Sequence, residues 1–465
     1  MKISRDRIIQ NYLIVSVLFC WLFIDCQSPI GQPEGWNRVP EILNRIHPPQ
    51  FAERDFLVTD FHAVGDGKTD CTESFRKAID ACHKAGGGRV IVPEGIYLTG
   101  AIHLKSNVNL HVTENATILF SQDTQKYLPV VHTRFEGVEC MNYSPFIYAF
   151  EQSNIAITGK GILDGQADER TWWLWALPGE NGDPVQKIDR DDLFRMGEEN
   201  VPVEQRIFGE GHFIRPNFIQ FYRCKNILIQ DISIRRSPMW EIHPVLSGNI
   251  TIDGVDIVSH GPNNDGCNPE SSRDVLIKNC HFDTGDDCIA IKSGRNGDGR
   301  RINTPSENIL IRNCSMKDGH GGVVIGSEIS GGCRNVYAEN CVMDSPNLER
   351  ALRIKTNSLR GGLVENIYMR NVRIGEVSDA ILRIYFYYED GDAGPFTPVV
   401  RNIFLEHITS EKSNYVLLLE GYERSPITYV RLDSCEFNGV QKGNILNHAA
   451  RIEMNHVRIN GQLQE

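Results

Sequence analysis

Three aspartates stand in two glycine-flanked clusters near the middle of this chain, within Asn263 to Gly294. Asp265 belongs to the first cluster, and Asp286 and Asp287 form the second. Carboxylates repel one another, so a fold that gathers three of them needs a reason to do so. The usual reasons are a metal, or acid and base roles in a single reaction. Whether the three gather depends on the elements that carry them.

A repeat runs along the chain from residue 154 onward. An Asn or Asp is followed by apolar residues at positions +1 and +3, a turn former at +5 and usually an apolar residue at +6. The alternation is typical of a strand with one buried face, and most spacings, at about 23 to 36 residues, fit solenoid coils with varied loops. The first position of the repeat is occupied by Asn154, Asn226, Asn249, Asp274, Asn308, Asn335, Asn366 and Asn402.

From this repeat we predict an all-β fold, a right-handed parallel β-helix solenoid. The stacked asparagines are expected to hydrogen-bond side chain to backbone between coils. An amphipathic helix over Thr69 to Ala85 precedes the strands, and we expect it to cap the first open end of the solenoid. Two stretches break the repeat, Gln166 to Asn217 and Phe386 to Phe396. Insertions in a solenoid become loops that line one face, often the binding face.

The repeat puts the candidate residues on four successive coils. Neighbouring coils stack about 4.8 Å apart, so the candidates make a band about 15 Å long, the size of a few sugar residues. Carboxylates over such a band suit glycosidic hydrolysis, and basic side chains beside them can bind a sugar carboxylate. The band contains Asp265, then Asp286 and Asp287, then His320, then Arg353 and Lys355.

The chain resembles glycoside hydrolase family 28, the polygalacturonases and their relatives, over about residues 55 to 440. That family carries four motifs in order, NTD, DD, GHG and RIK. They stand here as Asn263-Asn264-Asp265, Gly285-Asp286-Asp287, Gly319-His320-Gly321 and Arg353-Ile354-Lys355. Asn264 replaces the usual threonine, which leaves the carboxylate of the first motif intact.

The resemblance implies a role for each catalytic candidate. Asp286 would be the general acid, and Asp265 and Asp287 would position and deprotonate the attacking water. His320 would tune the protonation of the acid and help to hold substrate. The family inverts the anomeric configuration and uses no metal, so we expect neither a metal nor another cofactor.

The resemblance also implies that Arg353 and Lys355 bind the carboxylate of galacturonate, and we add Asn263 as a substrate-binding candidate. Three arginines that follow the aspartate pair could widen a cationic cleft or lie in a solvated loop, and we leave them out of the site. They are Arg295, Arg300 and Arg301.

We therefore predict hydrolysis of α-1,4-galacturonosidic bonds in pectin or polygalacturonan. We expect exo action, because the two interruptions of the repeat can close one end of a groove. One alternative is a hydrolase of rhamnogalacturonan or another pectin backbone. A second is a calcium-dependent pectate lyase, in which the aspartates bind the ion, and a third is a non-catalytic glycan-binding β-helix.

The composition and the N-terminus indicate which partners are disfavoured and where the protein is located. A net charge of −12 disfavours nucleic acid as a partner, and a polyanionic substrate would need local positive charge. Residues 1–26 combine a basic start with a short apolar run, typical of a signal peptide. Cys26 is a candidate lipidation site, so a lipid anchor and plain cleavage both stay open. We expect an exported protein, periplasmic, cell-surface or secreted, and a monomer, with a linker over 27–50 and the hydrolase domain over 51–465.

Overall fold

The structure is a computed structural model that describes residues 35–179 and 182–464. The predicted signal peptide, with Cys26, lies outside the described residues. Within the described ranges, no helix is long and apolar enough to cross a membrane.

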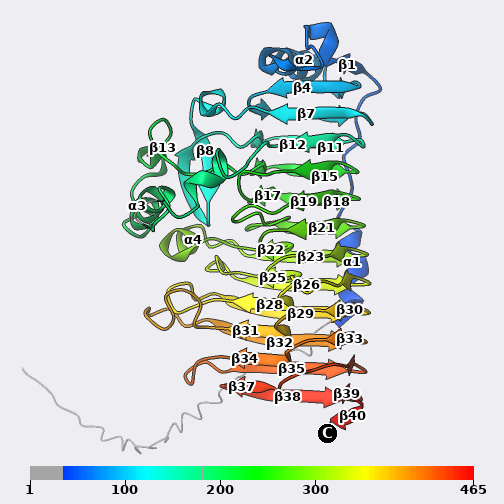
Figure 1. Cartoon of the computed structure of the whole chain (residues 1–465), viewed down its shortest axis with the longest axis vertical. Helices are drawn as coiled ribbons and strands as arrows, with labels where there is room; N and C mark the ends of the chain where they lie inside the picture. Colours follow the sequence, from blue (N-terminus) through cyan, green and yellow to red (C-terminus); the bar gives the residue numbers. More distant parts are fainter. Residues whose placement is uncertain (1–34, 180–181, 465) are drawn as a thin grey trace, which may run out of the picture. The chain divides into compact units, whose positions relative to one another are not determined.

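Three parallel sheets run along the solenoid and enclose one apolar core (Figure 1). The first sheet contains β1 (Asp55–Leu57), β3 (Gly88–Val92), β6 (Val108–Val112), β11 (Ser153–Thr158), β15 (Lys225–Gln230), β18 (Gly248–Asp253), β20 (Arg273–Lys278), β23 (Ser306–Arg312), β26 (Cys333–Glu339), β29 (Leu363–Arg370), β32 (Val399–Glu406), β35 (Ile427–Asp433) and β38 (Ala449–Asn455). The second contains β2 (Asp66–Asp70), β4 (Gly95–Thr99), β7 (Ala116–Phe120), β12 (Ile162–Asp164), β16 (Ser233–Arg235), β19 (Asp256–Ser259), β21 (His281–Thr284), β24 (Ser315–Met316), β27 (Val342–Met343), β30 (Arg373–Glu376), β33 (Thr409–Lys412), β36 (Glu436–Phe437), β39 (Val457–Ile459) and the antiparallel β40 (Gln462–Gln464).

The third sheet is divided into two parts. The first part contains β5 (Ile102–His103), β10 (Ile147–Phe150), β14 (Ile219–Tyr222) and β17 (Ile242–Val245), and the second contains β22 (Ile289–Ile291), β25 (Val323–Ile325), β28 (Arg350–Lys355), β31 (Ala380–Tyr385), β34 (Tyr415–Glu420) and β37 (Ile445–Asn447). Only single bridges cross the gap, where Cys267 pairs with Ile242 on one side and with Ile289 on the other. The coil at the gap is the one that carries Asp265.

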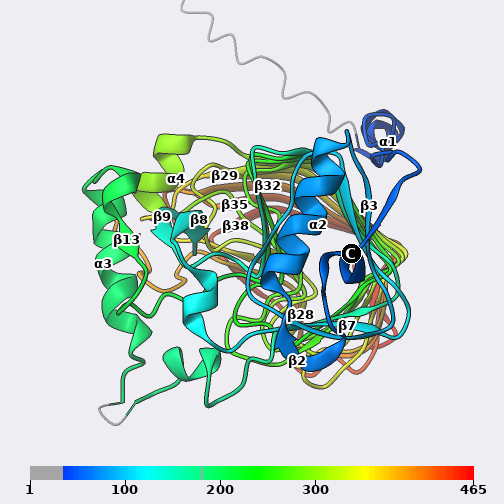
Figure 2. The same cartoon turned by 90° about the horizontal axis from the view of Figure 1, so that it is seen from above.

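The helices of the described residues lie at the first end and along the side of the coils (Figure 2). They are η1 (Gly35–Arg38), α1 (Val39–Leu43), η2 (Val58–Phe61), α2 (Thr72–Lys84), η3 (Thr124–Tyr127), η4 (Trp172–Trp175), α3 (Gln186–Glu198), η5 (Val203–Gln205) and α4 (Asn296–Ile302). Helix α2 buries Phe75, Ala78, Ile79 and Cys82 in the main core. The predicted β-helix with an N-terminal capping helix is therefore confirmed.

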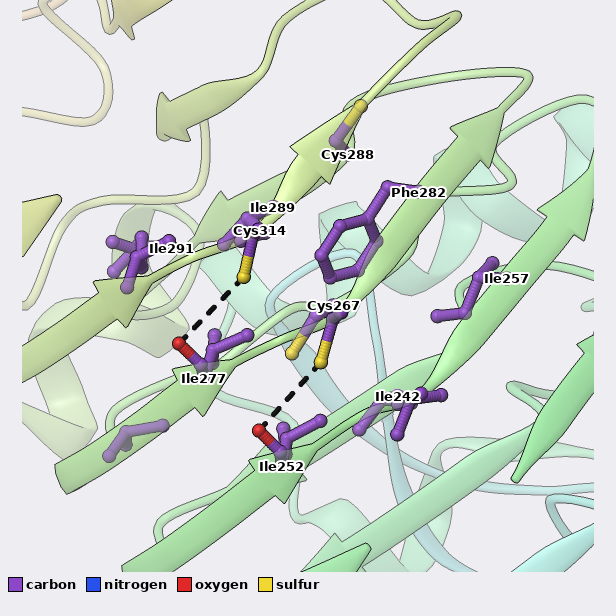
Figure 3. Packing of buried hydrophobic residues seen from close by; sticks show 14 of the residues in the cluster. Ile242, Ile252, Ile257, Cys267, Ile277, Phe282, Cys288, Ile289, Ile291 and Cys314 are labelled. Carbon is purple, nitrogen blue, oxygen red and sulfur yellow. Dashed lines mark hydrogen bonds between the residues drawn. The ribbon is translucent and has the colours of Figure 1, made fainter. Parts of the chain in front are cut away.

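The interior beneath the candidate site is a stack of small and branched apolar side chains. Cys267 and Cys288 lie there beside Ile289, and Cys314 donates its thiol to the Ile277 carbonyl at 3.9 Å (Figure 3). These cysteines are thus buried and behave as small hydrophobic residues with a weak S–H donor.

The ladder of asparagines turns the backbone as well as joining the coils. All eight predicted ladder residues have φ between 53° and 61°, a left-handed conformation that Asn and Asp adopt more readily than other side chains. Six of the hydrogen bonds between them run from Nδ2 of one side chain to Oδ1 of the next, over 2.8 to 3.2 Å. The prediction of side-chain to backbone bonds in this column was wrong, because each amide supplies both a donor and an acceptor to its neighbours.

The described start of the chain packs against the solenoid. We call residues 35–47, which include η1 and α1, the strap. Its apolar side chains cover the outer faces of β23, β26, β29 and β32, so the described part of the predicted linker is packed and the compact unit begins at Gly35. The contact includes Trp36, Val39, Ile42 and Ile46 from the strap and Leu310, Tyr337, Tyr368 and Phe404 from the strands.

Polar contacts fix the position of the strap at the one aspartate of the ladder. The Asp274 side chain has no N–H to donate to Asn249 Oδ1, and the backbone N–H of His47 donates there instead, at 2.8 Å. The Arg45 guanidinium donates to Asp274 Oδ1 at 2.9 and 3.1 Å. The strap therefore binds where the column of asparagines is broken.

Two groups of segments depart from the coils. The first excursion, residues 166–217, carries η4, α3, η5 and β13 (Ile207–Phe208), and the second excursion is residues 386–396. The first was predicted, but its partner was not: β8 (Val131–Phe135) and β9 (Val138–Asn142) form an antiparallel hairpin that pairs with β13. Helix α3, α4 and this small sheet lie together beside the coils (Figure 1).

Candidate active site

The fold brings the three aspartates together at the gap in the third sheet. Asp265, Asp286 and Asp287 each have a carboxylate oxygen within 4.8 Å of the others. Their exposure differs: the side chain of Asp286 is 18 % exposed, whereas those of Asp265 and Asp287 are 3 % and 0 % exposed. Asp286 is thus the carboxylate that a large molecule can reach.

Glycines allow the coils to approach closely at this point. A side chain at Gly285 would put Cβ 2.5 Å from the Gly261 carbonyl oxygen, and one at Gly319 would put Cβ 2.5 Å from the Asp286 carbonyl oxygen. Gly319 also has φ of 149°, which few other residues adopt. Because both positions are glycine, the His320 N–H can donate to the Asp286 carbonyl at 3.1 Å, and the two side chains meet.

His320 and Asp286 form an ion pair at the exposed side of the cluster. Nδ1 of His320 lies 3.0 Å from Oδ1 of Asp286. This hydrogen bond outweighs the effect of burial and raises the pKa of His320 to about 9. Burial acts to raise the pKa of Asp286, but the hydrogen bond from His320 and the charge of Lys355 hold it below its usual value.

Asp287 is paired with the basic residues of the fourth motif. Lys355 Nζ lies 2.8 Å from Asp287 Oδ2, and Arg353 Nη1 lies 3.6 Å from Asp287 Oδ1. Burial acts to lower the pKa of Lys355, but the charge of Asp287 reverses this and raises it. In the free protein these two cations are therefore paired with a buried carboxylate of the protein itself.

Asp265 is held by two groups that the motifs do not include. Asn268 Nδ2 donates to Asp265 Oδ2 at 2.7 Å, and Lys292 Nζ lies 3.6 Å from the same oxygen. Lys292 also pairs with Glu328 at 3.0 Å and lies 4.4 Å from the centre of the Trp240 ring. Burial and the negative charge of Asp286 raise the pKa of Asp265 well above its usual value. Of the three carboxyl groups, Asp265 is thus the one whose surroundings most favour the neutral form.

Asn263 connects the site to the first excursion. Its Oδ1 accepts a hydrogen bond of 2.6 Å from Arg215 Nη2, and Arg215 Nε donates to Gln186 Oε1 of α3 at 2.8 Å. Arg215 is fully buried, and its other hydrogen bonds go to the carbonyls of Pro238 and Pro262. The predicted substrate-binding amide thus has an internal partner on its oxygen.

The second excursion also reaches the site. The Tyr388 ring centre lies 5.2 Å from Lys355 Nζ and 5.6 Å from Arg353 Cζ. Glu389, the next residue, accepts hydrogen bonds from Arg295 at 3.1 Å and from Arg360 at 2.7 Å. Arg295, which the sequence left open as part of a solvated loop, is buried and bound to three other segments.

Some residues around the aspartates belong to none of the four motifs, namely Arg215, Asn268, Lys292, Arg295, Glu328 and Tyr388. For Lys292 a signal exists in the register of the third sheet. It pairs through a single bridge with Glu270, and Lys355 occupies the same column two coils further on, beyond Gly326. Because the loops between the strands differ in length, residue spacing in the sequence does not reveal this column.

We predict that Asp286→Asn lowers the pKa of the His320 imidazole from about 9 toward or below its ordinary value of about 6.5. In the wild type the folded pKa exceeds the unfolded one, so the contribution of the pair to stability is fully present below about pH 6.5 and is lost as pH rises through about 9. Titration of the histidine ring signals by NMR measures both values. A midpoint that is the same in both proteins would contradict the pairing.

Comparison with known proteins agrees with this geometry. The family model described as "Glycosyl hydrolases family 28" matches residues 204–453. A "Probable polygalacturonase" of Vitis vinifera is 31% identical over 387 residues, which are 80% of this chain and 72% of the relative. An "Exo-poly-alpha-D-galacturonosidase" of Dickeya chrysanthemi is 29% identical over 351 residues, which are 72% of this chain and 57% of the relative.

The fold has a similar solved structure. The crystal structure of a hyperthermoactive exopolygalacturonase from Thermotoga maritima superposes with a TM-score of 0.89 at 47% sequence identity, and it covers 92% of this chain and 97% of the other. The matched range contains all four motifs, and the fold and the grouping of their side chains are those that the motifs imply. The chain therefore belongs to family 28 of the glycosyl hydrolases and is a glycoside hydrolase.

Proposed function

We propose that this enzyme hydrolyses α-1,4-galacturonosidic bonds of polygalacturonan from the chain end. The observation that carries the chemistry is the set of three carboxylate oxygens within 4.8 Å of one another, one of them accessible and hydrogen-bonded to His320. The names of the Dickeya and Thermotoga relatives support galacturonan as the polymer and exo action as the mode.

We assign a different role to each carboxylate. Asp286, the accessible one, is placed to protonate the oxygen of the leaving sugar. Carboxylate oxygens of Asp265 and Asp287 lie within 4.8 Å of each other, so a single water can hydrogen-bond to both. Asp265 and Asp287 hold that water, and one of them accepts its proton as the bond to the sugar forms. A single displacement by water inverts the anomeric centre.

The acid must regain a proton before it acts. In the free protein the His320 hydrogen bond keeps the pKa of Asp286 low. A bound galacturonate brings its own negative charge and displaces water, and both changes favour the neutral acid. His320, whose Nδ1 lies 3.0 Å from Asp286 Oδ1, is the group from which that proton can come.

Local positive charge explains how an acidic protein accepts an acidic polymer. Arg353 and Lys355 face the aspartates and can exchange part of their interaction with Asp287 for one with a sugar carboxylate. Lys292 and His320 add two more cations around the same cluster. This compensation of the carboxylates by side chains supports hydrolysis over a calcium-dependent lyase.

We predict that polygalacturonan digests release galacturonate as the only early product. Viscosity should fall slowly relative to the number of reducing ends, because bonds inside the polymer stay intact. A rapid fall with mixed oligomers would mean endo action. Proton NMR during the first minutes should show the β-anomer, and the α-anomer as first product would mean retention.

The same assay separates the alternatives. Release of product from rhamnogalacturonan but not from homogalacturonan would move the substrate to the other pectin backbone. Unsaturated products that absorb in the ultraviolet, with a need for calcium, would mark a lyase. Complete absence of turnover would favour a glycan-binding protein.

We also propose export, with cleavage or lipidation near Cys26, on the basis of the basic start and apolar run of residues 1–26. Mass spectrometry of the mature N-terminus from fractionated cells distinguishes a lipid on Cys26 from a free amine. An intact Met1 in the soluble interior of the cell would contradict export.

A further inference from the structure

We infer that Glu389 joins the two excursions into one closed boundary beside the catalytic aspartates, and that this joint restricts the enzyme to chain ends. The inference rests on the proposed exo action. The inference identifies a residue that determines exo action. It follows from contacts that neither the motifs nor the relatives assign.

Arg295 is the point at which three departing segments meet. Its backbone N–H donates to the Gly137 carbonyl at the tip of the β8–β9 hairpin, at 3.1 Å. Its guanidinium lies 3.9 Å from the centre of the Phe194 ring on α3, and it donates to Glu389 of the second excursion at 3.1 Å. The segments come from distant parts of the chain, and Arg295 holds all of them.

Each excursion is also fastened to a catalytic motif at its other side. The first excursion holds Asn263, two residues before Asp265, through Arg215. The second places Tyr388 against Lys355, which pairs with Asp287. The contacts therefore lead from one catalytic aspartate through both excursions to another.

The Glu389 link in this series of contacts is both polar and partly exposed. The Glu389 side chain is 39 % exposed, whereas the side chains of its partners Arg295 and Arg360 are 10 % and 0 % exposed. Arg295 and Arg360 both donate to Oε2 of Glu389, at 3.1 and 2.7 Å, so their two positive charges lie close together and repel each other. Glu389 offsets that repulsion, so loss of its charge favours separation of the second excursion from Arg295.

A closed boundary has a direct effect on a polymer substrate. A chain that passes both sides of its cleaved bond needs an open path beyond the aspartates. Where the excursions are joined, the chain must stop, and only a terminal sugar reaches the acid. Opening the joint creates the path without a change in the catalytic groups.

The test compares Glu389→Gln with a matched control in the same excursion. Asp392 forms an ion pair with Arg424, whereas Glu389 pairs with Arg295 and Arg360, so Asp392→Asn removes a charge from the same loop and leaves the ion pairs of the joint in place. Glu389→Gln should lose exclusive release of galacturonate, with oligomers among the first products and a faster fall of viscosity per bond cleaved. Asp392→Asn should keep the wild-type pattern, and both should hydrolyse digalacturonate.

A second variant covers the case in which the amide introduced by Glu389→Gln still binds the arginines. Glu389→Lys places a third cation between Arg295 and Arg360 and should separate the second excursion from them, and thermal unfolding checks that the fold remains. Exclusive galacturonate release by both variants would overturn the inference. Oligomers from the wild type would instead refute the proposed exo action, and the same products from Asp392→Asn would show a general effect of loop charge.

Discussion

Asp286→Asn should reduce kcat on polygalacturonan by about a hundredfold to ten-thousandfold, the usual contribution of a general acid. The amide has nearly the same shape and keeps an oxygen for His320, but it has no acidic proton to give to the leaving sugar. Asp286 is also the one aspartate of the three that a substrate can reach. The loss should therefore appear in kcat, with the fold and much of the substrate binding retained.

The leaving group provides the sharper measurement. The nitrophenolate group of a nitrophenyl galacturonide departs without protonation. The loss of kcat caused by Asp286→Asn should therefore be much smaller on that substrate than on the polymer. Asp283→Asn is a suitable control, because Asp283 lies on the same coil but pairs with Lys317 at 2.9 Å. A variant that keeps a tenth of the wild-type rate on the polymer would remove Asp286 from the role of acid.

Lys355→Met should destabilise the protein by about 3 kcal/mol, the lower end of the cost of removing one partner of a buried ion pair. Asp287 is fully buried and would lose its 2.8 Å partner, which is the source of the cost. Arg353 stays 3.6 Å from the other oxygen of the same carboxylate and limits the effect. Urea unfolding of the purified enzyme measures the change in the free energy of unfolding.

A double variant separates this effect from substrate binding. Lys355→Met combined with Asp287→Asn removes both charges, so most of the lost stability should return while activity stays low. If Lys355 served only to bind a sugar carboxylate, the single variant would raise KM and leave the unfolding curve unchanged. A stability loss that the double variant fails to recover would also argue against the pair.

The repeat and the motifs predicted the solenoid and the grouping of the aspartates because both depend on short-range patterns. The alternation at +1 and +3 fixes which side chains enter the core, and a common position, twelve residues after the ladder residues Asp274 and Asn308, then stacks Asp286 with His320. The pairing of Lys355 with Asp287 lay outside this reasoning. It depends on how far the two side chains reach across the coils, and the spacing of the motifs does not contain that distance.

The hairpin β8–β9 escaped prediction for a related reason. Its strands, Val131–Phe135 and Val138–Asn142, resemble the short strands of the coils, and nothing local tells a strand that stacks from one that departs. The role of Arg295 was missed because its partners come from three distant segments. Contacts of this kind are set by tertiary packing, which a single sequence reveals only through its repeats.

The strap, which binds at the break in the asparagine ladder, has a consequence for the order of folding. The strap is the first described segment of the chain, but its apolar contacts are with Leu310, Tyr337, Tyr368 and Phe404, which lie on four later coils. Coils can form one after another as the chain becomes available, since each contacts mainly its neighbours. The strap cannot bury its side chains until the last of these four coils has stacked. A segment that is made early thus docks only after these later coils, and its docking records that they have assembled in register.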